Sequence, residues 1–318
     1  MRIIFAGSPA FAVPSLERLV ETHHDIVGVI TQPDRPAGRG LKLRSPPVKD
    51  LAVRCGLPVF QPEKFNTRSF LDLVEGMAPD LILVVAYGKI FRRRSLAIPA
   101  LGCVNLHASL LPKYRGIAPV NHALINGERE TGVTTIFMDQ GIDTGDIILS
   151  KPTPVGEDET AGEVLERLAV MGAGLVAETC DLIAEGKAPR LVQDESRASY
   201  APKLAKEDGW IRWDRSSEEV HNLIRGVTPR PGAVAVYGDA AVKIIRSKCG
   251  PGLYEPPGKV IGVDSDKGVL VSCSEGSIWL VGLQAQGRNA VSGADFARGY
   301  RVKVGDRFGS KTKQDLTG

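Results

Sequence analysis

The sequence is poor in cysteine. Its 318 residues include five cysteines, and no two of them form a C-x-x-C pair: Cys55, Cys103, Cys180, Cys249 and Cys273. An odd number of widely spaced cysteines argues against a disulfide framework and against a zinc site. We therefore expect a protein of the reducing cytoplasm that carries no metal.

Long hydrophobic runs are also missing. No segment approaches the ~20 consecutive apolar residues that span a bilayer, and residues 1–7 lack the basic flank and long apolar region of a signal peptide. The 35 Gly and 21 Pro residues are fewer than a disordered chain would have. These absences predict a chain that folds throughout, apart from its loops and tail, and has no membrane segment.

Charge of one sign is scarce, because a net charge of +3 is too small by itself to indicate a nucleic-acid binder. The distribution is uneven, however. From Leu204 onward the chain has 17 Lys or Arg against 13 Asp or Glu. This asymmetry suits a basic C-terminal half that faces a polyanion, although a solvated surface accounts for the charge equally well.

Short apolar runs alternate with helical patterns in the first half of the chain. We expect strands at 2–6, 25–31, 81–86, 104–107, 133–139 and 147–151, and helices at 13–21, 48–55, 69–75 and 160–185. The first three runs are rich in Ile, Val and Leu, which is typical of strands buried on both faces of a parallel sheet. The alternation predicts a Rossmann-like, doubly wound α/β domain.

A second domain is expected because 318 residues exceed the length of one ordinary domain. A strand at 210–213 and a helix at 217–225 precede brief strand patterns at 233–237, 242–245, 259–263, 269–273 and 278–283. Short strands separated by Gly-rich turns predict a smaller OB-like β-barrel. The predicted ranges are 1–186 for the first domain, 187–206 for a linker and 207–312 for the barrel domain.

The first strand-to-helix turn does not have the glycine pattern of a dinucleotide site. The G-x-G-x-x-G template needs glycine where Pro9 and Ala12 stand, so the backbone does not offer a close approach to a pyrophosphate. This argues against a nicotinamide-dependent enzyme.

The most informative segment is 105–119, which begins Asn-Leu-His-Ala-Ser-Leu-Leu-Pro. Asn105 and His107 are two residues apart at the end of an expected strand, so their side chains share one face. Ligands bind at this edge of open α/β sheets. Asp143 follows another expected strand in a Gly-flanked loop and could close over the same site. From the residues alone, a structural role for all three stays open.

The Asn-x-His pair, the Ser-Leu-Leu-Pro run and the later Asp-Thr-Gly together resemble the signature of enzymes that transfer a formyl group from 10-formyltetrahydrofolate. The resemblance extends over essentially the whole chain and implies a formyltransferase domain followed by the barrel. It implies that Asn105 and His107 donate hydrogen bonds to the oxygen of a tetrahedral intermediate. Asp143 would favour the charged form of His107 and order a water that relays protons. No metal is implied.

The same resemblance assigns contacts with the folate to two segments. Its members use the equivalent of Ser109, Leu110, Leu111 and Pro112 as a folate-contacting turn, and a segment like that of Tyr87, Gly88 and Ile90 flanks their pterin pocket. Ordinary core packing is an alternative role for Leu110 and Leu111, and the two roles are compatible.

The loop 31–47 indicates which amine accepts the formyl group. We expect it to have no regular structure, and with Lys49 it has five basic residues against one acid, Asp34, which suits phosphate binding. Its Gln-Pro-Asp-Arg-Pro-Ala-Gly-Arg-Gly run resembles the loop that methionyl-tRNA formyltransferases insert beside the acceptor stem of initiator tRNA. The resemblance implies initiator methionyl-tRNA as a partner, contacted by Arg39, Lys42 and Arg44.

Residues 225–233 and 296–306 resemble the tRNA-cradling domain of the same family, except that Arg230 stands between two prolines where relatives commonly have an aromatic residue. We expect a monomer. Two alternative functions stay open. An amino-sugar formyltransferase would share the three catalytic residues, but the cationic loop argues against it. A non-catalytic tRNA-binding protein would keep the loop and the barrel without needing those three residues.

Overall fold

The computed structural model describes residues 1–37, 42–252 and 255–310. The chain forms two compact units, each drawn from separate stretches of sequence. The first comprises Met1–Gly116, Thr131–Thr153 and Leu165–Tyr200, and the second comprises Ile117–Glu130, Pro154–Val164 and Ala201–Gly318. The ranges 1–186, 187–206 and 207–312 stay a prediction for the parts of the chain that fold independently.

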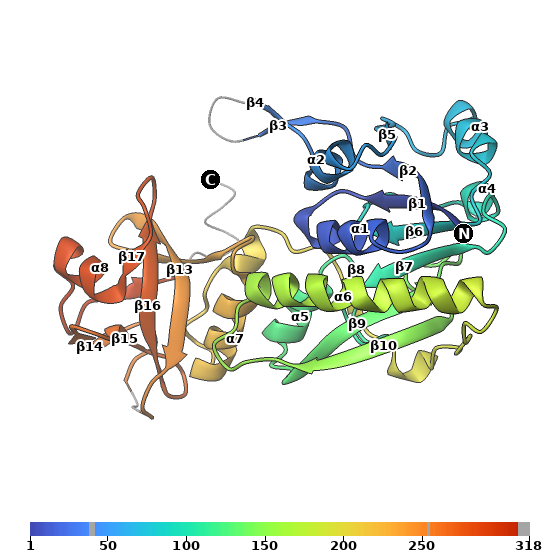
Figure 1. The fold of residues 1–318 in the computed structure, drawn as a ribbon. Coiled ribbons are helices and arrows are strands. Elements are labelled where there is room, and N and C mark those ends of the chain that lie inside the picture. Colours follow the sequence, from blue (N-terminus) through green and yellow to red (C-terminus); the bar gives the residue numbers. More distant parts are fainter. Residues whose placement is uncertain (38–41, 253–254, 311–318) are drawn as a thin grey trace. The chain divides into compact units, whose positions relative to one another are not determined.

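A seven-stranded sheet lies at the centre of the first unit, with strand order β10-β9-β7-β6-β1-β2-β5 (Figure 1). The strands are β1 Arg2–Gly7, β2 Asp25–Ile30, β5 Val59–Phe60, β6 Leu81–Val85, β7 Cys103–His107, β9 Glu130–Phe137 and β10 Ile147–Pro154. The pairs from β7 through β5 are parallel. Every residue of β6 is buried, as expected for an apolar run inside a two-sided sheet. The Rossmann-like class is confirmed.

The sheet is not parallel throughout. β9 pairs antiparallel with β7, so that His107 lies opposite Thr134. The prediction of a parallel sheet therefore does not extend to this edge. The apolar run of β9 indicates a buried strand but contains no information about its direction, which depends on the connection from β7.

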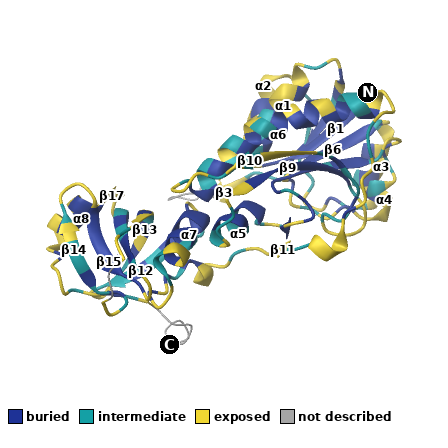
Figure 2. Cartoon of the chain, turned by 90° about the horizontal axis from the view of Figure 1, so that it is seen from below, coloured by how far each residue is buried: buried dark blue, intermediate teal, exposed yellow. Residues whose placement is uncertain are grey.

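Helices cover both faces of this sheet (Figures 1 and 2). They are α1 Val13–Val20, α2 Pro47–Arg54, α3 Arg68–Gly76, α4 Arg93–Leu96 and α6 Ala161–Ala184. α6 contacts β9 through Thr179, whose hydroxyl lies 2.8 Å from that of Thr135. It also contacts β7 at Gly172, where a Cβ would lie 2.6 Å from Leu106. Cys103, on the other face of β7, joins the buried cluster beneath α3.

The long loop after β2 contains a short hairpin. β3 Arg35–Ala37 pairs antiparallel with β4 Lys42–Arg44. The expectation of a loop without regular structure was therefore wrong for these residues. Each strand has three residues, which is too few for an alternating pattern to be distinguished from chance.

The second unit is built on another seven-stranded sheet, an antiparallel and curled one with order β14-β15-β16-β13-β12-β18 and with β17 beside β16. Its strands are β12 Ala233–Tyr237, β13 Ala240–Cys249, β14 Val260–Asp264, β15 Gly268–Ser272, β16 Ser277–Ala285, β17 Val291–Ser292 and β18 Phe308–Gly309. A buried cluster that includes Trp213, Phe296 and Phe308 forms its core. This architecture is consistent with the predicted OB-like domain.

The helices of the second unit were predicted only in part. α7 Ser217–Val227 agrees with the expected helix, whereas α5 Pro119–Ile125 and α8 Gly293–Tyr300, like α4 in the first unit, were not predicted. These three helices have four to eight residues, too short for a clear helical period. Ser292, whose hydroxyl accepts from the N–H of Asp295, was a recognisable capping signal for α8. The strand expected at 210–213 forms only an isolated bridge from Trp210 to Val234.

The remaining short strands are β8 Arg115–Gly116 and β11 Tyr200–Ala201.

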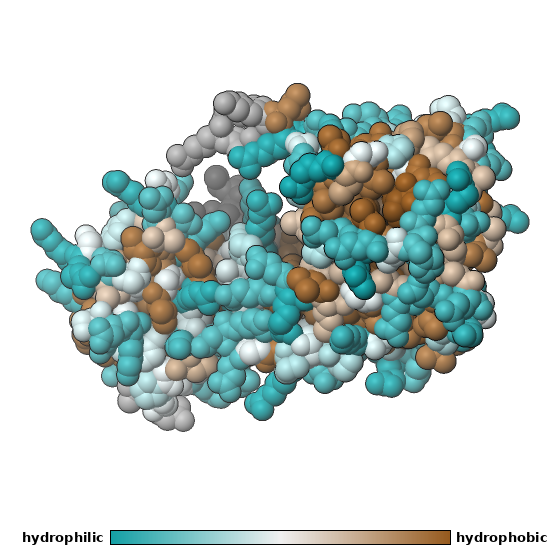
Figure 3. Space-filling view, viewed as in Figure 1, coloured by the Kyte–Doolittle hydropathy of each residue, from teal (hydrophilic) through white to brown (hydrophobic). Residues whose placement is uncertain are grey.

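Hydrophilic side chains cover most of the face that Figure 3 shows for the second unit. Within the described ranges, no helix has both the length and the apolar character that crossing a membrane requires. Even α6, with 24 residues, includes charged side chains along its length.

The start of α6 provides a test of stability. The backbone N–H of Thr160 donates to Glu163 at 2.9 Å, and Arg246 of β13 forms an ion pair with the same carboxylate. These hydrogen bonds, first that from Thr160 and then that from Arg246, lower the pKa of Glu163 to about 2. We expect Glu163→Gln to lower the free energy of unfolding at pH 7 by about 1 kcal/mol, because solvent screens this partly exposed pair.

The pH dependence has a definite sign. Because the folded-state pKa lies below the ordinary value of 4.5, the stabilisation is complete above about pH 4.5 and is lost as the pH falls toward 2. Denaturant unfolding of wild type and Glu163→Gln across this range measures it. Glu166→Gln, at an exposed position of the same helix, is the control and should change stability little. A Glu163→Gln deficit that persisted undiminished at pH 2 would contradict the assignment.

Candidate active site

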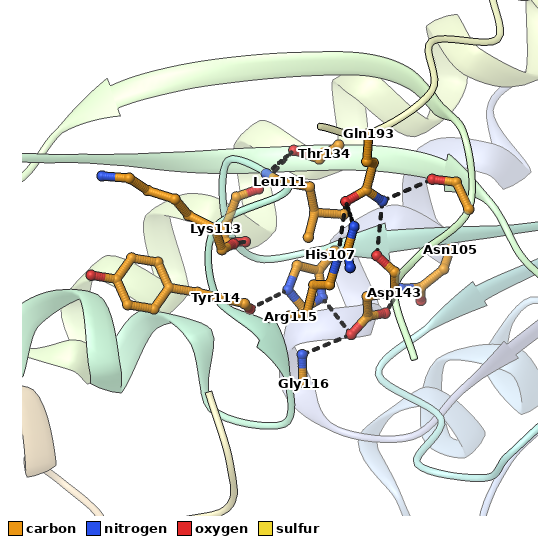
Figure 4. Close-up of polar contacts among 12 residues, drawn as sticks. Asn105, His107, Leu111, Lys113, Tyr114, Arg115, Gly116, Thr134, Asp143 and Gln193 are labelled. Carbon is orange, nitrogen blue, oxygen red and sulfur yellow. Dashed lines mark hydrogen bonds and ion pairs between the residues drawn. The ribbon is translucent and has the colours of Figure 1, made fainter. Parts of the chain in front are cut away.

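The predicted trio lies together at the end of β7 (Figure 4). Asn105 and His107 project from the same face of this strand, and Asp143 lies in the loop between β9 and β10. Nδ2 of Asn105 donates to Oδ1 of Asp143 at 3.3 Å, and Nδ1 of His107 lies 3.5 Å from Oδ2. One carboxylate therefore contacts both strand residues. The structure brings the three side chains together, and their chemical roles stay a prediction.

His107 has an oxygen partner at each ring nitrogen. Nε2 lies 2.9 Å from the backbone oxygen of Tyr114, and since a carbonyl oxygen only accepts, Nε2 bears a hydrogen. Nδ1 faces the Asp143 carboxylate, 3.5 Å from Oδ2. The side chain is only 6% exposed, so both contacts are shielded from solvent.

The local backbone explains why Asp143 lies where it does. Its φ of 56° falls in the left-handed region, which Asp tolerates better than most residues. The N–H of Gly116 donates to Oδ2 at 2.9 Å and fixes the carboxylate. Two residues later, Gly145 is required because a Cβ there would lie 1.7 Å from the backbone oxygen of Phe137. In the Asp-Thr-Gly sequence, Asp143 thus supplies the carboxylate, and Gly145 allows the close approach to the Phe137 backbone.

The predicted folate-contacting turn follows β7 directly and contains a cis peptide bond between Leu111 and Pro112. Thr134 of β9 anchors it, since its hydroxyl donates to the backbone oxygen of Ser109 at 2.7 Å and accepts from the N–H of Leu111 at 3.3 Å. Ser109, Leu111 and Pro112 are buried, and Leu110 is half-buried. The turn is rigidly held, and contact with a folate stays a prediction for these residues.

The second predicted folate segment is divided between core and surface. Tyr87 is 1% exposed and packs edge-on against Phe65, and burial raises its pKa. Its hydroxyl has no hydrogen-bond partner among the residues that the structure describes. Gly88 and Ile90, by contrast, are exposed. A ligand would therefore meet Gly88 and Ile90 first, while the Tyr87 side chain belongs to the core.

The predicted tRNA contacts are described only in part. Arg39 lies outside the described residues, Lys42 begins β4, and Arg44 ends it with an exposed side chain. Lys49, the fifth basic residue counted for this loop, forms an ion pair of 2.7 Å with Asp34. The positive charge that the loop offers to a phosphate is therefore smaller than its composition indicates.

Arg230, the residue that departs from the family pattern, is exposed in the second unit. It lies between two cis X-Pro bonds, Thr228–Pro229 and Arg230–Pro231. Its exposed position presents its charge to solvent.

A second layer of polar residues beside the trio was not predicted (Figure 4). Arg115, which is 1% exposed, donates to Oε1 of Gln193 at 2.8 Å and to Glu195 at 2.7 Å. The amide nitrogen of Gln193 donates to the backbone oxygens of Asp143 and Gly145, each at 2.8 Å. Gln193 lies in the polar stretch predicted to be a linker, so nothing local in the sequence indicated its contact with this loop.

All five cysteines are free. Cys103 lies on the same strand as Asn105 and His107, and burial raises its pKa to about 12, which keeps it a neutral thiol. The side chains grouped closely enough to hold a metal ion, among the residues described, are His23, His24 and Asp181. None of them belongs to the trio.

Comparison with known proteins agrees with this geometry. Two family models match the chain, "Formyl transferase" over residues 1–179 and "Formyl transferase, C-terminal domain" over residues 203–301. In fold, the chain is similar to a sugar 3N-formyl transferase, WlaRD, with a TM-score of 0.67 at 20% identity over 91% of this chain and 99% of that one. The family models show that the chain is a formyl transferase, and the structural similarity shows the shared fold.

More similar relatives narrow the assignment. The methionyl-tRNA formyltransferase of Geobacter sulfurreducens is 47% identical over 309 residues, which cover 97% of each chain. That of Pelotomaculum thermopropionicum is 48% identical over 307 residues, 96% of this chain and 97% of the relative. The chain belongs to the methionyl-tRNA formyltransferase family.

Proposed function

We propose that this protein transfers the formyl group of 10-formyltetrahydrofolate to the amino group of methionine on charged initiator tRNA. The observation that supports catalysis is that Asn105 and His107, at the end of β7, both contact the carboxylate of Asp143. A protein that only binds tRNA has no need of this arrangement. The family membership of the chain supports the methionyl acceptor.

The chemistry makes specific demands on the trio. The amine nitrogen attacks the formyl carbon, a C–N bond forms, and the electron pair of the C=O double bond moves to the oxygen. Asn105 donates one amide hydrogen to Asp143 and retains a second for this oxygen. An N–H of His107 supplies further stabilisation once it turns from the Tyr114 carbonyl toward the substrate.

Collapse of the intermediate completes the transfer. The bond from the formyl carbon to the folate nitrogen breaks, the attacking nitrogen loses a proton, and the folate nitrogen gains one. Asp143 would order the water that carries the proton between them. Its carboxylate also orients the His107 ring through Nδ1. These steps balance every atom and proton, and their products are formylmethionyl-tRNA and tetrahydrofolate.

The hairpin of β3 and β4 is the proposed tRNA contact. Arg35 and Arg44 at its base are exposed, and neither forms an ion pair with any residue inside the described ranges. Arg39 and Lys42 lie between them in the sequence, so the segment 35–44 contains four basic residues, a composition suited to a phosphate backbone. This charge favours a tRNA acceptor over an amino sugar.

The direct test of function is product identity. Labelled 10-formyltetrahydrofolate is incubated with the protein and total charged tRNA, and the labelled molecule is isolated. We expect label on initiator methionyl-tRNA and none on uncharged tRNA, which lacks the accepting amine. Label on an amino sugar nucleotide in a parallel reaction, with none on tRNA, would replace the proposed acceptor. Absence of any transfer with tight tRNA binding would favour the non-catalytic alternative.

A substitution at Arg39 tests the tRNA contact separately. Arg39→Ala should lower kcat/KM for charged initiator tRNA by roughly ten-fold, because one hydrogen bond to a charged group is lost. The slope of log kcat/KM against log salt should become shallower by about 1, since one phosphate contact is gone. Arg39→Lys should recover only part of the loss, because lysine lacks the planar bidentate fork.

The matched control is Arg54→Ala, which removes the same charge from the exposed end of α2. It should leave both the efficiency and the salt slope near wild type, and folate affinity should be unchanged in all three variants. Equal salt slopes for wild type and Arg39→Ala would exclude Arg39 as a phosphate contact.

A further inference from the structure

We propose that Gln193 and Arg115 are positioning residues that set the place of Asp143 during formyl transfer. The inference rests on the proposed function, because it assigns these residues a part in that reaction. Neither side chain reaches the trio's reacting groups directly. They act through the backbone of the Asp143 loop and through Gly116 (Figure 4).

Gln193 holds the loop through its backbone. It is 6% exposed, and its amide nitrogen uses both hydrogens on the loop, at the backbone oxygens of Asp143 and Gly145. The orientation of the amide is fixed, since its oxygen accepts from Nε of Arg115 at 3.1 Å and from a terminal nitrogen at 2.8 Å. A flipped amide would place its NH₂ group against the guanidinium, which has no acceptor.

Arg115 is linked both to the backbone and to the carboxylate of Asp143. Its side chain orients Gln193, which holds the Asp143 backbone, and the next residue, Gly116, donates to the Asp143 carboxylate at 2.9 Å. The guanidinium is itself anchored by two hydrogen bonds to Glu195. Glu195 raises the pKa of Arg115 further although burial acts in the opposite direction. Arg115, through Gln193, and Gly116 thus fix the positions of the main chain and of the side chain of Asp143.

This support matters because the Asp143 backbone is left-handed. Even for Asp this conformation brings Cβ close to the following carbonyl oxygen, and the external hydrogen bonds help to maintain it. Without Gln193 the loop can relax and move the carboxylate away from His107. A displacement of about 1 Å at a catalytic group can cost on the order of 10² in rate.

Two substitutions of Gln193 test the proposal. Gln193→Met keeps the length of the side chain and removes its hydrogen bonds, and kcat should fall about 10- to 100-fold with KM for folate and tRNA within about two-fold of wild type. Gln193→Glu keeps the acceptor for Arg115 but turns a carboxylate oxygen toward two carbonyl oxygens. Its kcat relative to wild type should recover as the pH falls, because a protonated carboxyl donates again to the loop.

The control is Val192→Ala, which shortens the adjacent side chain, 85% exposed, and should leave kcat unchanged. A double-mutant cycle separates positioning from general packing. In an Asp143→Asn background, Gln193→Met should reduce kcat less than two-fold further, because the carboxylate that it positions is gone. Independent, multiplying losses would overturn the proposal.

The outcomes are distinguishable from failure of the function. If wild type does not formylate methionyl-tRNA, the proposed function is wrong. If wild type is active and both Gln193 variants match its kcat at all pH values, the positioning role alone is wrong. Should Gln193→Met not fold, by circular dichroism, the pH profile of Gln193→Glu decides.

Discussion

His107→Ala and Asn105→Ala are each expected to lower kcat for formyl transfer by a factor of about 10²–10³, the usual consequence of removing one donor to a developing oxyanion. Binding of tRNA should be nearly unchanged, since neither side chain belongs to the cationic hairpin. Single-turnover formylation with saturating 10-formyltetrahydrofolate measures the chemical step, and filter binding measures tRNA affinity.

Folding must be controlled in these variants. His107 is buried and bonded to the Tyr114 carbonyl, so its removal takes away one hydrogen bond of that oxygen and costs about 0.5–1.5 kcal/mol of stability. His107→Asn, which keeps a donor near the same place, should retain more stability than His107→Ala while still losing the imidazole ring. His23→Ala, at a histidine that is 72% exposed, is the control. Turnover within a few-fold of wild type in both Ala variants would remove these residues from the mechanism.

Asp143→Asn is expected to slow the chemical step by roughly 10²–10⁴, the range associated with loss of general acid–base assistance. The substitution keeps an oxygen for the Gly116 N–H and a residue that tolerates φ of 56°. In the proposed mechanism it removes the carboxylate that orients His107 and the proton-relay water. The fold and folate binding should therefore persist while single-turnover rates fall.

Asp143→Ala provides the matched comparison. Alanine loses the charge as well, and it tolerates the left-handed backbone less well than asparagine. We expect it to be as slow as Asp143→Asn and measurably less stable in thermal unfolding. Unchanged single-turnover rates in Asp143→Asn would show that the carboxylate has no part in proton transfer.

The parts of the structure that local sequence determines were predictable. The run Leu81–Val85 is apolar at every residue because both faces of β6 are covered. Asn105 and His107 alternate with buried residues on one strand, so the two-residue spacing was sufficient to place them together. The steric requirement at Gly145 and the left-handed Asp143 likewise leave a readable motif.

Other features depend on contacts between distant residues and were not predictable. Arg115 and Gln193 are separated by 78 positions, and each belongs to a residue type that is normally found on the surface. Their burial beside the trio follows from the path of the chain after α6. The antiparallel direction of β9 and the pairing of Lys49 with Asp34 likewise depend on contacts that the local sequence does not reveal.

The hydrogen bonds from Gln193 to the Asp143 loop also determine when the site is completed as the chain leaves the ribosome. Asn105, His107 and Asp143 emerge early, but the residues that hold the Asp143 loop follow α6, at Gln193 and Glu195. A nascent chain that ends at residue 186 would contain the whole trio without this support. Because domains fold as their last long-range contacts become available, activity should appear during synthesis only after residue 195 has left the exit tunnel.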